Sequence, residues 1–185
     1  IAFEDGVIDE SVLGLCAAVE AHEHGDARRA LDLLRVAAEL AERSKSEEIL
    51  ETHVIRAKTK IELDCVIEAV RTLPIQSKLV LMSILIGEEN GNPKQMTGDV
   101  YNTYKKLARK AGKGILTQRR VADLISELDM MGLVSARVKS FGRGGRTKVI
   151  TVSVPLMETR QILEKDPMLE PVKDIRVKTQ STLQI

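Results

Sequence analysis

The stretch TQRRVADLISELDMMGLVSARVKSFGRGGRTKVITVSV (residues 117–154) decides the fold, because its hydrophobic period changes part-way along. Up to Gly132 the apolar residues recur every three or four positions, which is the spacing of one helix face. They are Val121, Leu124, Ile125 and Leu128. From Leu133 onward apolar and polar residues alternate, as is typical of β-strands. The stretch therefore predicts a helix from Thr117, followed by two strands around a glycine-rich turn.

Two further segments with a helical pattern precede this stretch. Residues 75–89 are strongly apolar and end in the turn-rich sequence NGNPKQ, and residues 97–112 carry an apolar face between a possible cap at Thr97 and a stop at Gly112. Three helices and a two-stranded β-hairpin, in this order, predict a winged helix-turn-helix over residues 73–155. Residues 156–185 are expected to pack on it as a C-terminal tail or to be partly frayed.

The first 72 residues have the pattern of a helical bundle. Residues 9–23, 26–43 and 52–73 each carry apolar positions at helical spacing, and short polar turns separate them. The fold class is therefore mainly α: a helical bundle over residues 1–72 followed by the winged helix-turn-helix and its hairpin wing.

The net charge of +1 hides two regions of opposite sign. Residues 1–70 contain 8 Lys/Arg against 16 Asp/Glu, a net charge of −8, whereas residues 71–155 contain 15 against 6, a net charge of +9. Such an asymmetry suggests an acidic module joined to a basic one that meets a polyanion. The sequence has no apolar run of about 18 residues, so no membrane span is predicted. Its two cysteines lack the spacing of a metal site, which favours a reduced, cytoplasmic setting.

The helix that begins at Thr117 is the candidate recognition helix, since the second helix of this motif enters the major groove by its N-terminal part. At about 100° per residue, Arg119 points away from the apolar stripe. Arg and Gln can pair with base edges, and small residues allow close approach. The alternative is an ordinary solvated helix face. The predicted DNA contacts of this helix are Thr117, Gln118, Arg119, Arg120, Ala122 and Ser126.

The hairpin has five basic residues and no acidic residue between positions 137 and 148. Arg146 and Lys148 are expected on the solvent side of the second strand, opposite Ile150 and Val152, where they would hold phosphates. Arg143 at the tip is expected to enter the minor groove. The alternative is a hairpin whose charges only protect its edges. The predicted DNA contacts of the hairpin are Arg137, Lys139, Arg143, Gly144, Arg146 and Lys148.

Two other groups of basic residues can each be interpreted in two ways. Lys105 and Arg109 could hold phosphates beside the recognition helix or belong to an ordinary lysine-rich surface. Arg28 lies in the first turn expected for the helix from Asp26, where the helix dipole disfavours cations. A docked anion such as a nucleotide phosphate would explain it, and so would a surface salt bridge to Asp32 or Glu23. The sequence AGKG (111–114) lacks the spacing of a Walker A motif.

Taken together, these segments resemble the C-terminal part of the archaeal replication initiators, relatives of the eukaryotic origin-recognition and helicase-loading AAA+ proteins. GDARRALDLLRVAAELAER (residues 25–43) is similar to the sensor-2 helix of their AAA+ lid, and LPIQSKLVLMSIL (residues 73–85) with residues 120–152 is similar to their winged helix. The resemblance implies a lid over residues 1–72, with Arg28 as the sensor-2 arginine that reaches ATP or ADP in the full-length protein. It also implies binding of double-stranded origin DNA, with the recognition helix in the major groove and the wing in the minor groove.

The resemblance implies further limits and partners. The sequence holds no Walker A or Walker B motif, so no ATP hydrolysis, bound cofactor or metal is expected of this segment. The chain does not begin with Met and is expected to be a piece of a longer protein. The replicative helicase and other initiator copies are candidate protein partners. Two alternatives stay open: a winged-helix transcription regulator whose helical region dimerises, and a winged-helix module that docks a helicase.

Overall fold

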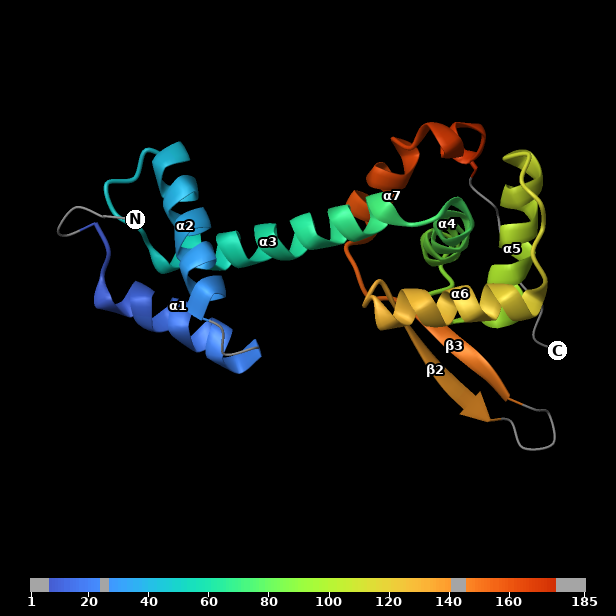
Figure 1. Ribbon diagram of the computed structural model, residues 1–185, viewed down its shortest axis with the longest axis horizontal. Coiled ribbons are helices and arrows are strands. Elements are labelled where there is room, and N and C mark those ends of the chain that lie inside the picture. The colour runs from blue at the N-terminus through green and yellow to red at the C-terminus, as the bar shows by residue number, and fades with distance from the viewer. Residues whose placement is uncertain (1–6, 24–26, 141–145, 176–185) are drawn as a thin grey trace. The chain divides into compact units, whose positions relative to one another are not determined.

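The computed structural model describes residues 7–23, 27–140 and 146–175, without the side chains of Glu20, His22, Glu23 and Arg146. The chain divides into two compact units, Ile1–Cys65 and Val66–Ile185 (Figure 1). The first unit contains α1 (Glu10–Glu23), α2 (Ala27–Arg43) and the beginning of α3 (Glu51–Thr72). Because α3 crosses the division, it contributes residues to both units.

The first unit is built on the apolar stripes that the sequence shows. Val12, Leu33 and Val54, one from each helix, are almost fully buried in a common core. His53 is buried where α3 begins: its Nδ1 accepts a hydrogen bond from the Leu50 amide at 3.0 Å, and its Nε2 lies 3.2 Å from the Ser44 hydroxyl oxygen. The imidazole thus satisfies polar groups at the end of α2 and the start of α3.

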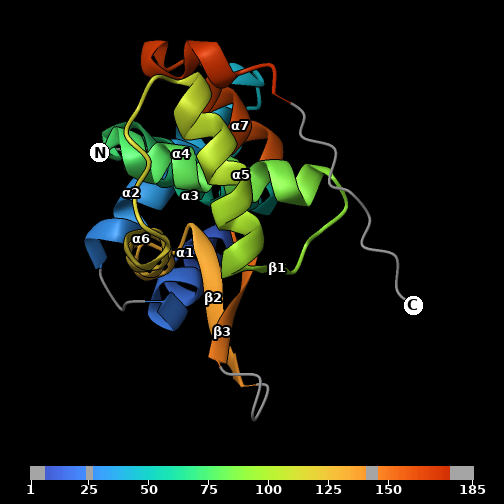
Figure 2. The same cartoon turned by 90° about the vertical axis from the view of Figure 1, so that its right-hand side faces the viewer.

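The second unit is a winged helix-turn-helix, as predicted. Its elements are α4 (Ile75–Glu89), β1 (Gln95–Met96), α5 (Thr97–Lys110), α6 (Gln118–Met130), β2 (Val134–Ser140), β3 (Arg146–Val152), α7 (Leu156–Glu164) and the 3-10 helix η2 (Pro167–Val172). The strands form an antiparallel sheet in the order β1-β3-β2. Figures 1 and 2 both show the hairpin of β2 and β3 extending away from the helices of this unit.

Helix α4 occupies the centre of the second unit. Every residue from 79 to 86 is buried, because α5, α6, β3 and α7 all pack against it. A helix that is apolar on all sides is stable only when it is enclosed in this way. The strongly apolar segment predicted from the sequence is therefore the central core helix.

The helix ends follow local chemistry. The Thr117 hydroxyl accepts a hydrogen bond from the Arg120 amide at 3.3 Å and caps α6, as predicted. Gly112 and Gly132, which follow α5 and α6, have φ of 64° and 72°, a region that glycine enters without a Cβ clash. One prediction needs a small correction: Met96 occupies the cap of α5, and Thr97 is the first helical residue.

Strand β1 was not predicted from the sequence, because it has only two residues. Gln95 pairs with Ile150 of β3 and is buried, and its side-chain amide donates to the Ile84 carbonyl of α4 at 2.7 Å. Gly87 makes room for it: a Cβ on Gly87 would lie 2.0 Å from Gln95 Oε1. The third strand thus depends on a close approach between α4 and a buried glutamine.

The register of the hairpin overturns one prediction. Lys148 lies opposite Val138, and Ile150 lies opposite Ala136. Positions two apart in a strand share a face, so Lys148 is on the same face as the buried Ile150 and not on the opposite one. The Arg146 side chain lies outside the described residues.

Residues 156–175 pack on the winged helix. Leu163, Leu169 and Val172 join its core. The Lys78 ammonium of α4 lies 2.6 Å from Asp166 Oδ2 and 2.8 Å from the Arg71 carbonyl. Arg160 of α7 is buried, pairs with Glu164 at 2.6 Å and donates to the Lys173 carbonyl at 2.7 Å. Within the described ranges, no helix combines the length and the apolar character needed to cross a membrane.

Candidate nucleic-acid interface

The first turn of α6 presents a row of solvent-exposed polar side chains. Thr117, Gln118, Arg119 and Arg120 are all exposed. The buried residues Val121, Leu124, Ile125 and Leu128 hold the opposite face of the helix against the core. The sequence therefore placed the exposed face of α6 correctly.

Arg120 differs from Arg119 in having a partner on its own helix. Its Nη1 lies 3.3 Å from Glu127 Oε1, with both side chains about half exposed. An exposed ion pair of this kind is weak and can be exchanged for another anion. Arg120 is therefore available to a phosphate at small cost.

The turn that leads into α6 is held from two sides by a network that was not predicted. The Tyr104 hydroxyl donates to Gln76 Oε1 at 2.6 Å and accepts from the Leu116 amide at 3.1 Å. Gln76 in turn donates to the Gly114 carbonyl at 3.0 Å, and the Tyr101 hydroxyl donates to the Leu116 carbonyl at 3.2 Å. Burial raises the pKa of Tyr104, so its hydroxyl stays protonated and able to donate. The network fixes where α6 begins relative to α4 and α5.

Lys148 of the hairpin is bound to α6, the candidate recognition helix. Its ammonium donates to the Ala122 carbonyl at 3.3 Å and to the Ser126 hydroxyl. Ser126 Oγ donates to the same carbonyl at 3.0 Å. The structure thus brings three predicted DNA-contacting residues together in one intramolecular network, with all three side chains partly buried.

The other hairpin residues divide between exposed and undescribed positions. Arg137 and Lys139 are exposed along β2. Arg143 and Gly144 lie outside the described residues. At the base of the hairpin, Asp129 Oδ1 of α6 accepts from the Ala136 amide at 3.0 Å. The outer part of β2 thus presents cations to solvent, while its base is attached to α6.

The two candidates on α5 have different surroundings. The Lys105 ammonium lies 4.8 Å from the centre of the Tyr101 ring, a cation–π contact that restrains it. Arg109 is exposed in the last turn of α5. Arg109 is the more accessible of the two for a phosphate.

Arg28 belongs to the first unit. It is exposed in the first turn of α2, and that turn contains no acidic residue. Asp26, from which this helix is expected to start, lies outside the described residues. Asp32, one of the two predicted salt-bridge partners, lies 3.6 Å from Arg35.

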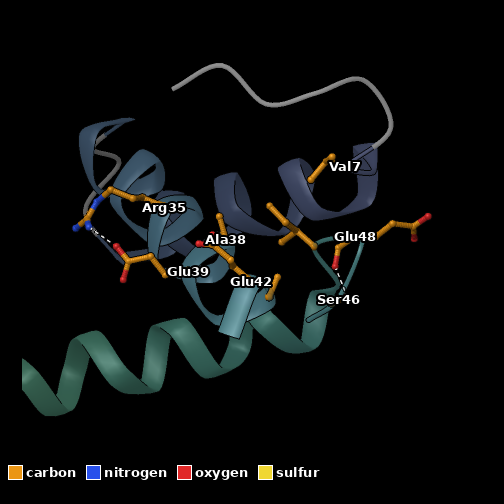
Figure 3. A pocket seen from close by; sticks show the side chains of 9 residues that line it. Val7, Arg35, Ala38, Glu39, Glu42, Ser46 and Glu48 are labelled. Atoms are coloured by element: carbon orange, nitrogen blue, oxygen red, sulfur yellow. Dashed lines mark hydrogen bonds and ion pairs between the residues drawn. The ribbon is translucent and has the colours of Figure 1, made fainter. Parts of the chain in front are cut away.

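A pocket of about 340 Å³ in the first unit does not include Arg28 (Figure 3). Its lining carries three carboxylates, and Arg35 there is already paired with Glu39 at 2.7 Å. Carboxylates repel phosphate, so this pocket does not fit an anion. The pocket is lined by Val7, Arg35, Ala38, Glu39, Ala41, Glu42, Ser46, Glu48 and Ile49.

Comparison with known proteins places both units in one family. Residues 68–162 match the family model of the CDC6 C-terminal winged helix domain, and residues 1–59 match that of the Cdc6 AAA+ ATPase-type lid domain. The chain belongs to the Cdc6 family. The resemblance inferred from residues 25–43, 73–85 and 120–152 is thereby confirmed, as is the mainly helical fold of lid and winged helix.

The relatives are archaeal replication proteins. An ORC1-type DNA replication protein of Halobacterium salinarum is 58% identical over 95% of this chain and 34% of its own length. A second one, of Pyrococcus furiosus, is 49% identical over 97% of this chain and 43% of its own length. The solved structure of the Aeropyrum pernix ORC1 protein in complex with DNA is 48% identical, with a TM-score of 0.83, over 91% of this chain and 44% of that one. The Cdc6-family chain thus spans less than half the length of these relatives.

Proposed function

We propose that this chain is the part of an archaeal replication initiator that binds double-stranded origin DNA. The observation that carries the proposal is the exposed first turn of α6 together with a hairpin that exposes Arg137 and Lys139 along β2. In a helix-turn-helix this turn enters the major groove, and cations on the wing neutralise phosphates.

The residues divide by the contact that they can make. Gln118 and Arg119 can reach base edges, because their side chains are long and exposed. Arg109, Arg120 and Arg137 can hold phosphates, since each is an exposed cation. Thr117 can donate its hydroxyl to a phosphate while it caps α6. For Arg143, entry into the minor groove stays a proposal from the sequence, and so does a DNA contact of Gly144.

Two comparisons support DNA binding by an initiator. The Aeropyrum pernix ORC1 protein, 48% identical to this chain, was solved in complex with DNA. The match of residues 1–59 to an AAA+ ATPase-type lid favours an initiator over a transcription regulator, because a regulator needs no such lid. Docking of a helicase or of another initiator copy is the outcome that the experiment below separates from DNA binding.

The lid carries a second proposal, which concerns the nucleotide of the whole protein. Arg28 would contact a phosphate of ATP or ADP, because it is an exposed guanidinium at the N-terminal end of α2, where the amides of a first helical turn also attract anions. In a chain that also carries the ATPase base, Arg28→Ala should weaken ATP binding as measured by calorimetry. Unchanged affinity would contradict this role.

The DNA-binding proposal is tested by footprinting the chain on origin DNA at two salt concentrations. We expect protection of a defined sequence and a steep fall of affinity with salt. Arg119→Ala should weaken protection of that sequence. If Arg119→Ala combined with Arg137→Ala leaves DNA binding unchanged, the surface serves another partner.

A further inference from the structure

Lys148 does not behave as a solvated wing cation in this structure. Its ammonium makes two hydrogen bonds to α6, one to the Ala122 carbonyl and one to the Ser126 hydroxyl. Ser126 itself donates to the Ala122 carbonyl, so its oxygen lone pairs remain open to the ammonium. The three groups form a consistent set of donors and acceptors without any added ligand.

The position of Lys148 along the hairpin allows this contact to restrain the angle of the hairpin to α6. The base of the hairpin is attached to α6 where Asp129 accepts from the Ala136 amide. Ala136 pairs with Ile150, and Lys148 lies two residues nearer the tip, about 7 Å farther out. One attachment would let the hairpin tilt about its base, whereas two attachments fix its angle to α6.

We propose that Lys148 is a positioning residue that sets the angle between the wing and the recognition helix through Ser126 and the Ala122 carbonyl. The inference rests on the proposed function, because the angle matters for DNA that both elements contact. Lys148 and Ser126 then act on each other and not on the DNA. Their effect on binding is indirect. They fix the position of the wing relative to α6, so that α6 can read bases while the wing holds the DNA backbone.

This role predicts a loss of discrimination and not only a loss of affinity. A wing at a variable angle can still neutralise phosphates on any duplex. It loses the contacts that require a single position of the wing on the DNA. The affinity for a preferred sequence should therefore fall towards that for a scrambled one.

The first part of the test uses the protein without DNA. Ser126→Ala removes one of the two acceptors and keeps every charge, while Lys148→Met removes the donor of both hydrogen bonds. Each should speed hydrogen exchange of the amides of Lys139 and Thr147, which face each other across the hairpin, about tenfold, the effect of losing one charge-assisted hydrogen bond. The double variant should be no faster than Lys148→Met, because removing the Ser126 hydroxyl has no further effect once the donor is gone. Ser135→Ala, on the other face of β2, is the matched control and should leave exchange unchanged.

The second part measures affinity for two duplexes: one selected by the wild-type chain from a random pool, and the same one scrambled. Ser126→Ala and Lys148→Met should lower the ratio of the two affinities about tenfold, again without adding to each other. Arg137→Met, a predicted phosphate contact, should lower both affinities equally and leave hairpin exchange unchanged.

Two results would overturn the positioning role. One is unchanged exchange and unchanged discrimination in both Ser126→Ala and Lys148→Met. The other is a Lys148→Met variant that behaves as Arg137→Met does, which would make Lys148 a phosphate contact. If the wild-type chain shows no preference between the duplexes, the proposed function fails, and the exchange cycle alone decides whether Lys148 holds the wing to α6.

Discussion

In the lid unit, Arg35 pairs with Asp32 and Glu39 along one helix, whereas in the winged-helix unit Lys78 of α4 reaches Asp166 at the start of η2. The exposed fractions of the side chains differ accordingly: 51% for Arg35 but 12% for Lys78. The first pairing lies on the surface of a single helix, and the second joins segments 88 residues apart in the sequence. These two kinds of ion pair therefore contribute differently to stability.

The same difference in burial separates the cations of the winged-helix unit into two groups. Arg160 is buried and Lys78 is largely buried, and both bind groups of the C-terminal segment. Lys148 is bound to α6, while Arg119 and Arg137 are exposed. A net charge of +9 over residues 71–155 thus overstates the charge that is available to DNA. Burial and partners, not the count of charges, therefore decide which cations we propose as DNA contacts.

The largest expected effect tests whether the exposed cations of the winged helix bind DNA and those of the lid do not. Arg119→Ala combined with Arg137→Ala should weaken duplex binding about a hundredfold, since each such contact contributes about 1–3 kcal/mol. The measurement is a titration of labelled duplex followed by fluorescence anisotropy. Arg35→Ala in the lid removes the same kind of side chain and should leave affinity within about twofold. Equal losses in both variants would mean that overall charge alone drives binding.

A smaller effect contrasts two glycines in helices. Gly87→Ala in α4 should destabilise the winged helix by about 2 kcal/mol, because the new methyl group displaces the buried Gln95 side chain. Gly14→Ala in α1 meets no atom within 4 Å and should stabilise the lid by up to about 1 kcal/mol. Hydrogen exchange of core amides measures both. A stabilising Gly87→Ala would show that Gln95 can move without loss.

The bridge between Lys78 and Asp166 predicts a dependence on pH. The hydrogen bond from Lys78 is the main reason that the pKa of Asp166 lies below its ordinary value of 3.8. A lowered carboxyl pKa stabilises the fold above the ordinary value, and that stability is lost as the pH falls through the folded-state pKa. Asp166→Asn should therefore cost about 1.5 kcal/mol at neutral pH and progressively less below about pH 4. Urea unfolding at several pH values measures the difference, and a cost that does not change with pH would contradict the bridge.

The smallest effect is expected from the lid pair. Arg35→Ala breaks two exposed pairs along α2 and should change the free energy of unfolding by less than about 0.5 kcal/mol. The change should shrink further at high salt, because exposed charges are screened. Thermal unfolding at low and high salt checks this. A loss as large as that of Asp166→Asn would remove the distinction between the two kinds of pair.

Local features of the sequence determined the helices and the winged-helix order. The stripe from Val121 to Leu128, the Thr117 cap and the glycines after α5 and α6 act over a few residues, so their spacing alone predicts their structure. The exposed face of α6 follows from the same spacing, because the buried stripe defines its opposite side. The family resemblance could be read from such segments as well.

Contacts between distant segments were decided only by the tertiary structure. Strand β1 exists because β3 lies beside it, and Tyr104 holds the turn before α6 because Gln76 comes within 2.6 Å. The face of Lys148 follows from the two-residue period of its strand, but its partner Ser126 lies 22 residues away. No local pattern encodes such pairs, since each depends on how helices and strands pack. The sequence by itself determined which residues are basic, and the packing decided which of them are open to a partner.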